Sequence, residues 1–539
     1  MATTPAPPPV PPAAPGGPSR PDDPALPVAP TPPRPRARRA WPVQELVASA
    51  LSGVALWTAF PPFDLGPIAL VALVPLMWAW REASPRRAAL YGFVFGLFFF
   101  GPLLEWIRYF GVIAIAPLVR ATSAYMAVTG LVVGGLNRLG LRSVWLVAAT
   151  WVVFEAVRGR WPLGGLPWGE VGVAFHDIPV ARDLASWGGV LLVSFLAVAC
   201  NGLVLDALLA LRARQWRPLT FAASGLVGIT FITMVGSVAR FDPTPTGEIR
   251  FAMLQGNDQN RDLTVAERES YLPASHFDLA EELEGDYDVI VFPESSLGGR
   301  NPEAGDEQEL RERIVDLAEA HDAAVVVNGL IPVDDSDRDY NTNYVYDPDG
   351  ALQGTYAKQH LVPFGEYVPW RSILGWIDAL QQVPTDYQPG SEREMFEIGG
   401  RAVGTMICFE SAFSAISRDY VRDGAEAIIV TTNNRSYRRS ANSAQHLAIT
   451  QMRAAETGRP VLHASISGIS GVIDADGSVS GTTEMFDRTV VTGTITTTSG
   501  QTPYVRYGEW VLWGSALALV ITIALGFRRR RAAARGSRP

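Results

Sequence analysis

The chain has 539 residues, too many for one ordinary domain, and its net charge is −9. Hydrophobic residues make up 48% and charged residues only 18%, and the mean hydropathy is +0.12. Soluble domains carry about 25% charged residues, so this composition favours a membrane protein with a soluble part over a purely soluble one. No basic run interleaved with aromatic residues indicates nucleic-acid binding.

Residues 1–40 are rich in Pro and Ala and end in PRPRARRA, which predicts a disordered tail with a basic end. The tail lacks the layout of a signal peptide, because its prolines precede the first apolar run.

Apolar runs follow, and several approach the ~20 residues that cross a bilayer. We expect about eight spans, seven in a membrane domain at 41–240 and the last in the segment 506–539. They lie near 43–60, 66–80, 88–107, 121–137, 143–157, 184–211, 218–238 and 510–527.

The arginines between these runs predict the orientation, because cytoplasmic loops carry more basic residues than external ones. With a cytoplasmic N-terminus, the inside segments hold Arg34, Arg36, Arg38, Arg39, Arg81, Arg86, Arg87, Arg138, Arg142, Arg212, Arg214, Arg217 and Arg528 to Arg531. The outside loops hold fewer, among them Arg108, Arg120, Arg158 and Arg160. Both termini are then cytoplasmic, and residues 241–505 are extracytoplasmic.

The segment 241–505 has a different pattern, in which short β-rich runs such as DVIVFPES and AVGTMICFE alternate with amphipathic helical stretches. This alternation predicts a layered α/β domain.

Three positions in this domain are candidates for chemistry. Glu294 and Cys408 each follow an apolar strand, where active-site groups commonly lie. Lys358 is the only lysine among 45 basic residues, which hints that an amine is required there. A nucleophilic cysteine needs a base and a cation, and these residues supply both. Alternatively, Cys408 is a buried strand cysteine, Glu294 is a helix N-cap or a surface acid, and Lys358 is a lysine retained by chance.

Other catalytic classes have less support. The two cysteines, Cys200 and Cys408, are too few for a disulfide framework or a cysteine zinc site. The six histidines are scattered, and none forms a close metal-ligand pair, so we expect neither a metal nor a cofactor.

The motifs PES, YAK followed by PFGEYVP, and CFE resemble the nitrilase superfamily, whose triad is Glu-Lys-Cys in that order. With the membrane spans, the chain resembles the apolipoprotein N-acyltransferase family more closely. FPPFDLGPIALVALVPL at 60–76, LPWGEVGVAF at 166–175 and QHLAITQMRAAETGRPVLHASISGISGVIDADG at 445–477 also look like that family's patterns.

By position, the resemblance implies that Glu294 is the general base, Lys358 the stabiliser of the transition state and Cys408 the nucleophile. Glu366 and Glu410 match supporting acids, and the backbone N–H of Phe409 is an expected oxyanion donor.

The resemblance further implies an αββα fold for the α/β domain and a bacterial inner-membrane location. The expected reaction moves an acyl chain from a phospholipid to the N-terminal amine of a diacylated lipoprotein through a thioester. The alternatives are a membrane-bound amidase or hydrolase with the same triad, and a non-catalytic envelope scaffold.

Two further segments are candidates for substrate binding. Where the family usually has a pattern such as WFG after its Asn pair, this chain reads Asn433, Asn434, Arg435, Ser436 and Tyr437, which puts its substrate preference in doubt. The apolar stretch at 367–378, with Trp370 and Trp376, predicts either an arm that enters the outer leaflet of the membrane lipid or a buried helix.

Overall fold

The computed structural model describes residues 42–258, 264–377, 380, 383 and 385–536. The tail predicted at 1–40 lies outside these residues.

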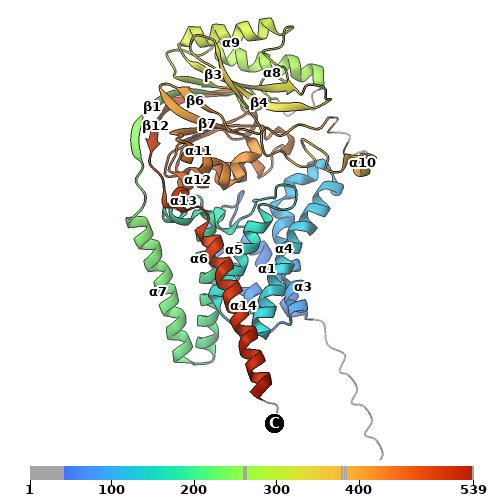
Figure 1. The fold of residues 1–539 in the computed structure, drawn as a ribbon, viewed down its shortest axis with the longest axis vertical. Coiled ribbons are helices and arrows are strands. Elements are labelled where there is room, and N and C mark those ends of the chain that lie inside the picture. Colours follow the sequence, from blue (N-terminus) through green and yellow to red (C-terminus); the bar gives the residue numbers. More distant parts are fainter. Residues whose placement is uncertain (1–41, 259–263, 378–379, 381–382, 384, 537–539) are drawn as a thin grey trace, which may run out of the picture. The chain divides into compact units, whose positions relative to one another are not determined.

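The first half of the described chain is helical (Figure 1). Two helices return after the α/β domain, α13 (Pro503–Tyr507) and α14 (Trp510–Gly536). Those before it are α1 (Val43–Trp57), η1 (Gly66–Leu70), α2 (Val74–Trp80), α3 (Pro85–Leu103), η2 (Glu105–Phe110), α4 (Val112–Arg138), α5 (Val144–Arg158), η3 (Val171–Phe175), α6 (Pro179–Arg212) and α7 (Trp216–Val238).

Within the described ranges, four helices are long and apolar enough to cross a membrane. They are Val112–Arg138, Pro179–Arg212, Trp216–Val238 and Trp510–Ala532, and Val43–Trp57 and Gly66–Trp80 are shorter apolar segments. Length and composition therefore support four of the eight predicted spans, and the remainder stay a prediction.

Two of the predicted spans have other boundaries in the structure. The run at 66–80 contains two short helices, η1 and α2, whose second residues are Pro67 and Pro75, and a proline lacks the N–H that would continue a preceding helix. The run at 121–137 belongs to α4, which starts at Val112. Arg120 does not interrupt this helix because its side chain is exposed.

The α/β domain contains two six-stranded sheets. The first has the order β12-β1-β2-β3-β4-β5 and the second β11-β10-β9-β8-β7-β6. The strands are β1 (Thr244–Gln255), β2 (Val289–Val291), β3 (Ala324–Pro332), β4 (Asp339–Tyr346), β5 (Leu352–Ala357), β6 (Met395–Ile398), β7 (Arg401–Ile407), β8 (Ala427–Thr432), β9 (Val461–Ser465), β10 (Gly471–Ile473), β11 (Val479–Thr482) and β12 (Thr489–Ser499).

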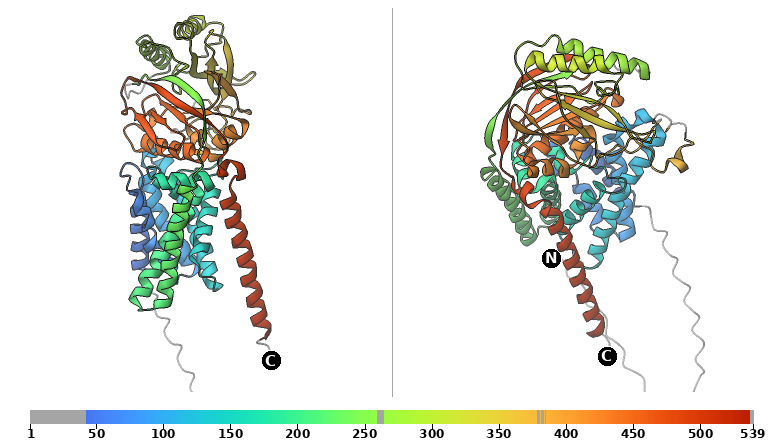
Figure 2. Two further views of the ribbon diagram at one scale, coloured as in Figure 1. Left: turned by 90° about the vertical axis from the view of Figure 1, so that its left-hand side faces the viewer. Right: turned by 45° about the horizontal axis from the view of Figure 1, so that its top comes forward.

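Helices cover the outer faces of both sheets, which gives an αββα sandwich (Figures 1 and 2). Alternate residues of a strand face opposite sides, and β1 shows both environments. Phe251 and Met253 pack in the large core that also holds Ile407, while Ala252 and Leu254 pack in a separate core under the helices. The helices on the outer face of the first sheet are α8 (Val265–Ala280) and α9 (Gln308–His321). The helices on the outer face of the second sheet are α11 (Ser414–Asp423) and α12 (Asn442–Thr457).

The helix α12 joins the second sheet to the membrane helices, because it contacts both β9 and α6. The side chain of Gln445 is buried at this junction and bonds to three separate segments of the helical half. Its Oε1 accepts from Nε1 of Trp106 at 3.1 Å and of Trp168 at 2.7 Å, and its Nε2 donates to the Pro61 carbonyl at 3.1 Å. This amide thus contributes to holding the α/β domain against the helical half.

Candidate active site

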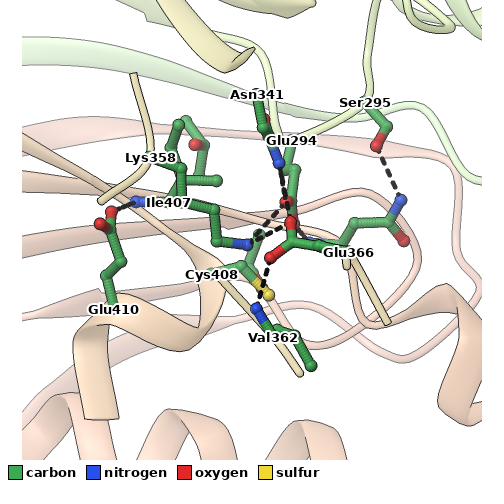
Figure 3. A network of polar contacts seen from close by, with 12 residues as sticks. Glu294, Ser295, Asn341, Lys358, Val362, Glu366, Ile407, Cys408 and Glu410 are labelled. Carbon is green, nitrogen blue, oxygen red and sulfur yellow. Dashed lines mark hydrogen bonds and ion pairs between the residues drawn. The ribbon is translucent and has the colours of Figure 1, made fainter. Parts of the chain in front are cut away.

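Both sheets contribute to one buried polar site (Figure 3). Glu294 lies three residues after β2 and Lys358 directly after β5, both in the first sheet, while Cys408 directly follows β7 in the second. All three residues are almost fully buried, with exposed fractions of 5% for Glu294, 1% for Lys358 and 9% for Cys408. The structure therefore brings together the three residues that the sequence pointed to.

The Lys358 ammonium lies between two carboxylates. Its Nζ donates to Oε1 of Glu366 at 2.8 Å and to Oε1 of Glu294 at 3.3 Å. The Asn341 amide Nδ2 also donates to both oxygens, at 3.1 Å and 2.8 Å respectively. Because a buried charge is tolerated only when it is paired and hydrogen-bonded, these contacts hold the amine in one position.

The second oxygen of Glu294 is also occupied. Its Oε2 accepts from the backbone N–H of Asn433 at 2.8 Å, and Asn433 Nδ2 donates to Ser295 Oγ at 3.0 Å. Asn433, predicted as a substrate-binding residue, therefore orients the candidate base through its backbone. Asn434 is buried, and its side-chain amide lies beside the ring of His446, 3.2 Å from Nδ1.

The Cys408 backbone is strained. Its φ of +54° lies in the left-handed region, which costs a non-glycine residue of order 1–3 kcal/mol and occurs mostly at functional sites. The neighbouring segment Cys408–Ala412 forms the 3₁₀ turn η5, whose first N–H groups have no partner within the turn. Figure 3 shows the Cys408 side chain beside those of Lys358 and Glu366.

His446, in α12, contacts this turn through its ring. Its Nε2 lies 3.1 Å from the Cys408 carbonyl oxygen and 2.8 Å from Ser411 Oγ. Because a carbonyl oxygen can only accept, Nε2 carries the proton. Burial lowers the pKa of His446 to about 4, so the ring is neutral at pH 7 and does not act as a cation beside Cys408.

Glu410 connects the turn of Cys408 to the loop of Lys358. Its carboxylate accepts from the backbone N–H of Ile407 at 2.8 Å and of Gln359 at 2.7 Å, and from Tyr356 Oη at 2.9 Å. The residue is fully buried. Glu410 therefore holds the segments that carry Cys408 and Lys358 at a set spacing.

The charges around Cys408 have opposing effects on its thiol. Burial and the Glu294 carboxylate raise the pKa of Cys408 to about 12, against the Lys358 charge, which lowers it. Burial also opposes the charge of Lys358, but the carboxylates of Glu294 and Glu366 hold the pKa of Lys358 well above its ordinary value. At neutral pH the site thus holds an ammonium and a protonated thiol that needs a base for attack.

Asn341 and His446 were absent from the residues singled out by sequence. A weak signal exists for Asn341, since β4 reads DYNTNYVY and places amides at two positions of one strand face. Both Asn341 and Asn343 are buried, which is unusual for amides without a specific partner. His446 had no such signal, because only the folded chain places α12 behind Cys408.

The remaining predicted substrate-binding residues are less buried than Glu294, Lys358 and Cys408. Trp370 and Trp376 are 62% and 79% exposed and flank α10 (Arg371–Leu374), so the alternative of a buried helix is wrong. Tyr437 packs edge-on against Trp106, with ring centroids 4.7 Å apart, and lies 5.8 Å from the ring of Phe110. The altered loop is therefore in contact with η2 of the helical half.

Comparisons with known protein families match the helical part and the α/β domain separately. Residues 52–203 match the family described as apolipoprotein N-acyltransferase N-terminal domain. Residues 252–504 match the family described as carbon-nitrogen hydrolase.

Individual relatives match along almost the whole chain. Proteins named apolipoprotein N-acyltransferase from Methylococcus capsulatus and Vibrio cholerae are 32% and 30% identical. The alignments cover 92% and 90% of this chain, and 99% and 97% of those proteins. A solved structure of a carbon-nitrogen hydrolase superfamily protein from Xanthomonas campestris aligns with 47% of this chain and 91% of its own, at 24% identity and a TM-score of 0.36.

Proposed function

Because the chain belongs to the apolipoprotein N-acyltransferase family, we propose that it moves an acyl chain from a phospholipid to the N-terminal amine of a diacylated lipoprotein, with Cys408 as nucleophile. The observation that carries the residue assignment is the Lys358 ammonium, held between the Glu294 and Glu366 carboxylates next to the Cys408 turn. This arrangement supplies a nucleophile, a base and a cation in one buried site.

In the first step, Glu294 takes the thiol proton as the Cys408 sulfur attacks the carbonyl carbon of the sn-1 ester. Lys358 and the backbone N–H of Phe409 stabilise the negative charge that develops on the carbonyl oxygen. The C–O bond of the ester then breaks, and Glu294 returns the proton to the leaving alcohol. The products are lysophospholipid and a thioester on Cys408.

In the second step, the free α-amine of the S-diacylglyceryl-cysteine attacks the thioester carbonyl. Glu294 takes a proton from the amine, the C–S bond breaks, and Cys408 recovers its thiol proton. Glu366 keeps Lys358 charged and in position throughout, because the Glu366 carboxylate accepts the shorter of the two hydrogen bonds that Lys358 Nζ donates to carboxylates. Acylation before the acceptor binds predicts ping-pong kinetics.

The proposed location is the bacterial inner membrane, with the α/β domain outside and both termini in the cytoplasm. The arginine distribution supports this orientation, and the four long apolar helices support the membrane attachment. We keep the proposal of eight spans, with the shorter apolar helices completing the membrane part. A phosphatase reporter fused after Ala239 should be active, and one fused after Arg531 should be inactive. The reverse result would contradict the orientation.

The decisive experiment is intact-mass analysis of the full chain after incubation with phospholipid. An adduct of one acyl chain on Cys408 is expected in the wild-type protein and absent in Cys408→Ala. Addition of a diacylated lipopeptide should remove the adduct and produce triacylated peptide. Release of free fatty acid alone would favour a hydrolase, and absence of any adduct would contradict the proposal.

A further inference from the structure

A cavity of about 240 Å³ lies between the helical half and the α/β domain. One wall includes Ala412, the last residue of the turn that begins at Cys408, and His360, two residues after Lys358. The opposite wall comes from the segment that follows α5 and from the break in α6 at Gly189. The cavity therefore adjoins the two segments that carry the candidate nucleophile and the cation.

Glu170, in the segment that follows α5, lines this cavity. The residue is only 7% exposed, yet its carboxylate makes no hydrogen bond or ion pair with any residue that the structure describes. Buried polar groups in folded proteins almost always have a partner, because an unpaired one costs the free energy of its lost hydration. A carboxylate that is buried, unpaired and open to a cavity indicates a partner that comes from outside the chain.

The other acids of the cavity differ from Glu170. Glu456 forms an ion pair with Arg453 at 2.9 Å, and Glu509 forms one with Arg160. Of the three acids that line the cavity, Glu170 is the one without a cation within ion-pair distance among the described residues. The charge missing from the cavity is therefore a single positive one, beside Glu170.

The wall of the cavity indicates which kind of cation fits. Leu191, Phe413 and Ile416 contribute apolar surface. A calcium ion takes about six to eight oxygen ligands. Across the described ranges, no group of three or more His, Cys, Asp or Glu side chains could hold a metal ion. One carboxylate among apolar side chains suits an ammonium carried on carbon better than a metal ion.

The acidity of Glu170 agrees with such a ligand. Burial and the Glu155 carboxylate raise the pKa of Glu170 to about 8, against the charges of Arg453 and Arg158. In these surroundings the acid is mostly protonated at pH 7. A bound ammonium favours the carboxylate, because an opposite charge lowers its pKa. The ammonium in turn donates hydrogen bonds to the carboxylate oxygens.

We propose that this cavity binds a primary ammonium group of a substrate, with Glu170 as its counterion. The inference rests on the proposed function, which offers two sources of such a group. One is the N-terminal amine of the diacylated acceptor, and the other is the headgroup of a phosphatidylethanolamine donor. Both substrates come from the membrane, and the cavity lies beyond the end of α5, so either can present its ammonium there.

The test compares Glu170→Gln with Glu248→Gln in full-length protein reconstituted in phosphatidylglycerol vesicles, which contain no primary amine. Glu248 is exposed on β1 and is the matched control. Acylation of Cys408 is followed by intact mass, and transfer to a diacylated lipopeptide with a free N-terminus by its triacylated product. We expect the KM for the lipopeptide to rise roughly tenfold in Glu170→Gln, the scale of a lost charge-assisted hydrogen bond. Acylation in these vesicles should be unchanged, and Glu248→Gln should behave as the wild type.

Two further measurements separate the sources of the ammonium and the role of the cavity. In phosphatidylethanolamine vesicles, acylation of Glu170→Gln that is slower than in phosphatidylglycerol would assign the site to the donor headgroup. Ala415→Leu keeps Glu170 but fills the cavity from α11, and it should show the same defect as Glu170→Gln. The thermal midpoint of Glu170→Gln should stay the same or rise, because a neutral amide replaces an unpaired buried acid.

A lower thermal midpoint with equal slowing of acylation in both lipids would assign Glu170 a structural role and overturn the proposal. An unchanged KM together with unchanged acylation in both lipids would also overturn it, while leaving the proposed function intact. A wild-type protein that neither lipid acylates would contradict both.

Discussion

The inner site and its outer rim are held in very different ways. Around Glu294, Lys358 and Glu410, each functional group has two or more partners within hydrogen-bonding distance and almost no exposure. At the rim, Trp370 and Trp376 are mostly exposed. The difference supports the proposal that the chemistry depends on fixed geometry, whereas the exposed side chains of the rim can change with little effect on the fold.

The largest effect is expected from Lys358. Lys358→Met should slow acylation of Cys408 by roughly 10³-fold, because it removes the cation that faces the oxyanion and leaves two buried carboxylates unpaired. Lys358→Arg keeps the charge but should lose nearly as much, since a planar guanidinium does not fit a site 1% exposed. Intact-mass time courses measure both, and near-normal acylation in either variant would show that the inner site is less constrained than its contacts indicate.

Glu410→Gln should have the next largest effect. An amide NH2 group, which can only donate, replaces one of the two acceptor oxygens, so a backbone N–H at Ile407 or Gln359 loses its partner. We expect acylation to slow roughly 10²-fold on the scale of a misplaced catalytic group, and the free energy of unfolding to fall by about 2 kcal/mol. Glu397→Gln, at an exposed position on β6, is the matched control and should change neither the rate nor the thermal midpoint.

The pH dependence of Cys408 separates charge from catalysis. With its pKa raised to about 12, the thiol is protonated at pH 7, and alkylation by iodoacetamide should rise about tenfold per pH unit up to at least pH 9. Glu294→Gln removes a charge that raises this pKa, so alkylation at pH 8 should become several-fold faster while lipid acylation becomes slower. A parallel fall of both rates would contradict the assigned origin of the shift.

The smallest effect is expected at the rim. Trp370→Ser with Trp376→Ser should slow acylation by membrane phospholipid about fivefold, because less apolar surface can enter the leaflet, and should leave alkylation of Cys408 unchanged. Trp216→Ser, a comparably exposed tryptophan on α7, is the control. Unaltered turnover in the double variant would remove the proposed lipid-contacting arm and with it part of the contrast between site and rim.

The sequence predicts the residues of the candidate site, and the structure adds their contacts. The apolar strands that precede Glu294 and Cys408, and the single lysine, were sufficient to nominate the three catalytic candidates, because strand ends and composition are local properties. The apolar run at 66–80 is divided into η1 and α2, a detail that average hydropathy does not register because it ignores the special geometry of Pro67 and Pro75. The candidate site was therefore predictable in its residues but not in its contacts.

The sequence by itself thus determined the apolar segments, the α/β pattern and the identities of Glu294, Lys358 and Cys408. Only the tertiary structure decided that His446 lies behind the Cys408 turn and that Gln445 bonds to the helical half. The physical reason is that each of these contacts joins residues from separate elements, whose approach is set by the packing of α12, η2 and the two sheets and not by any local periodicity.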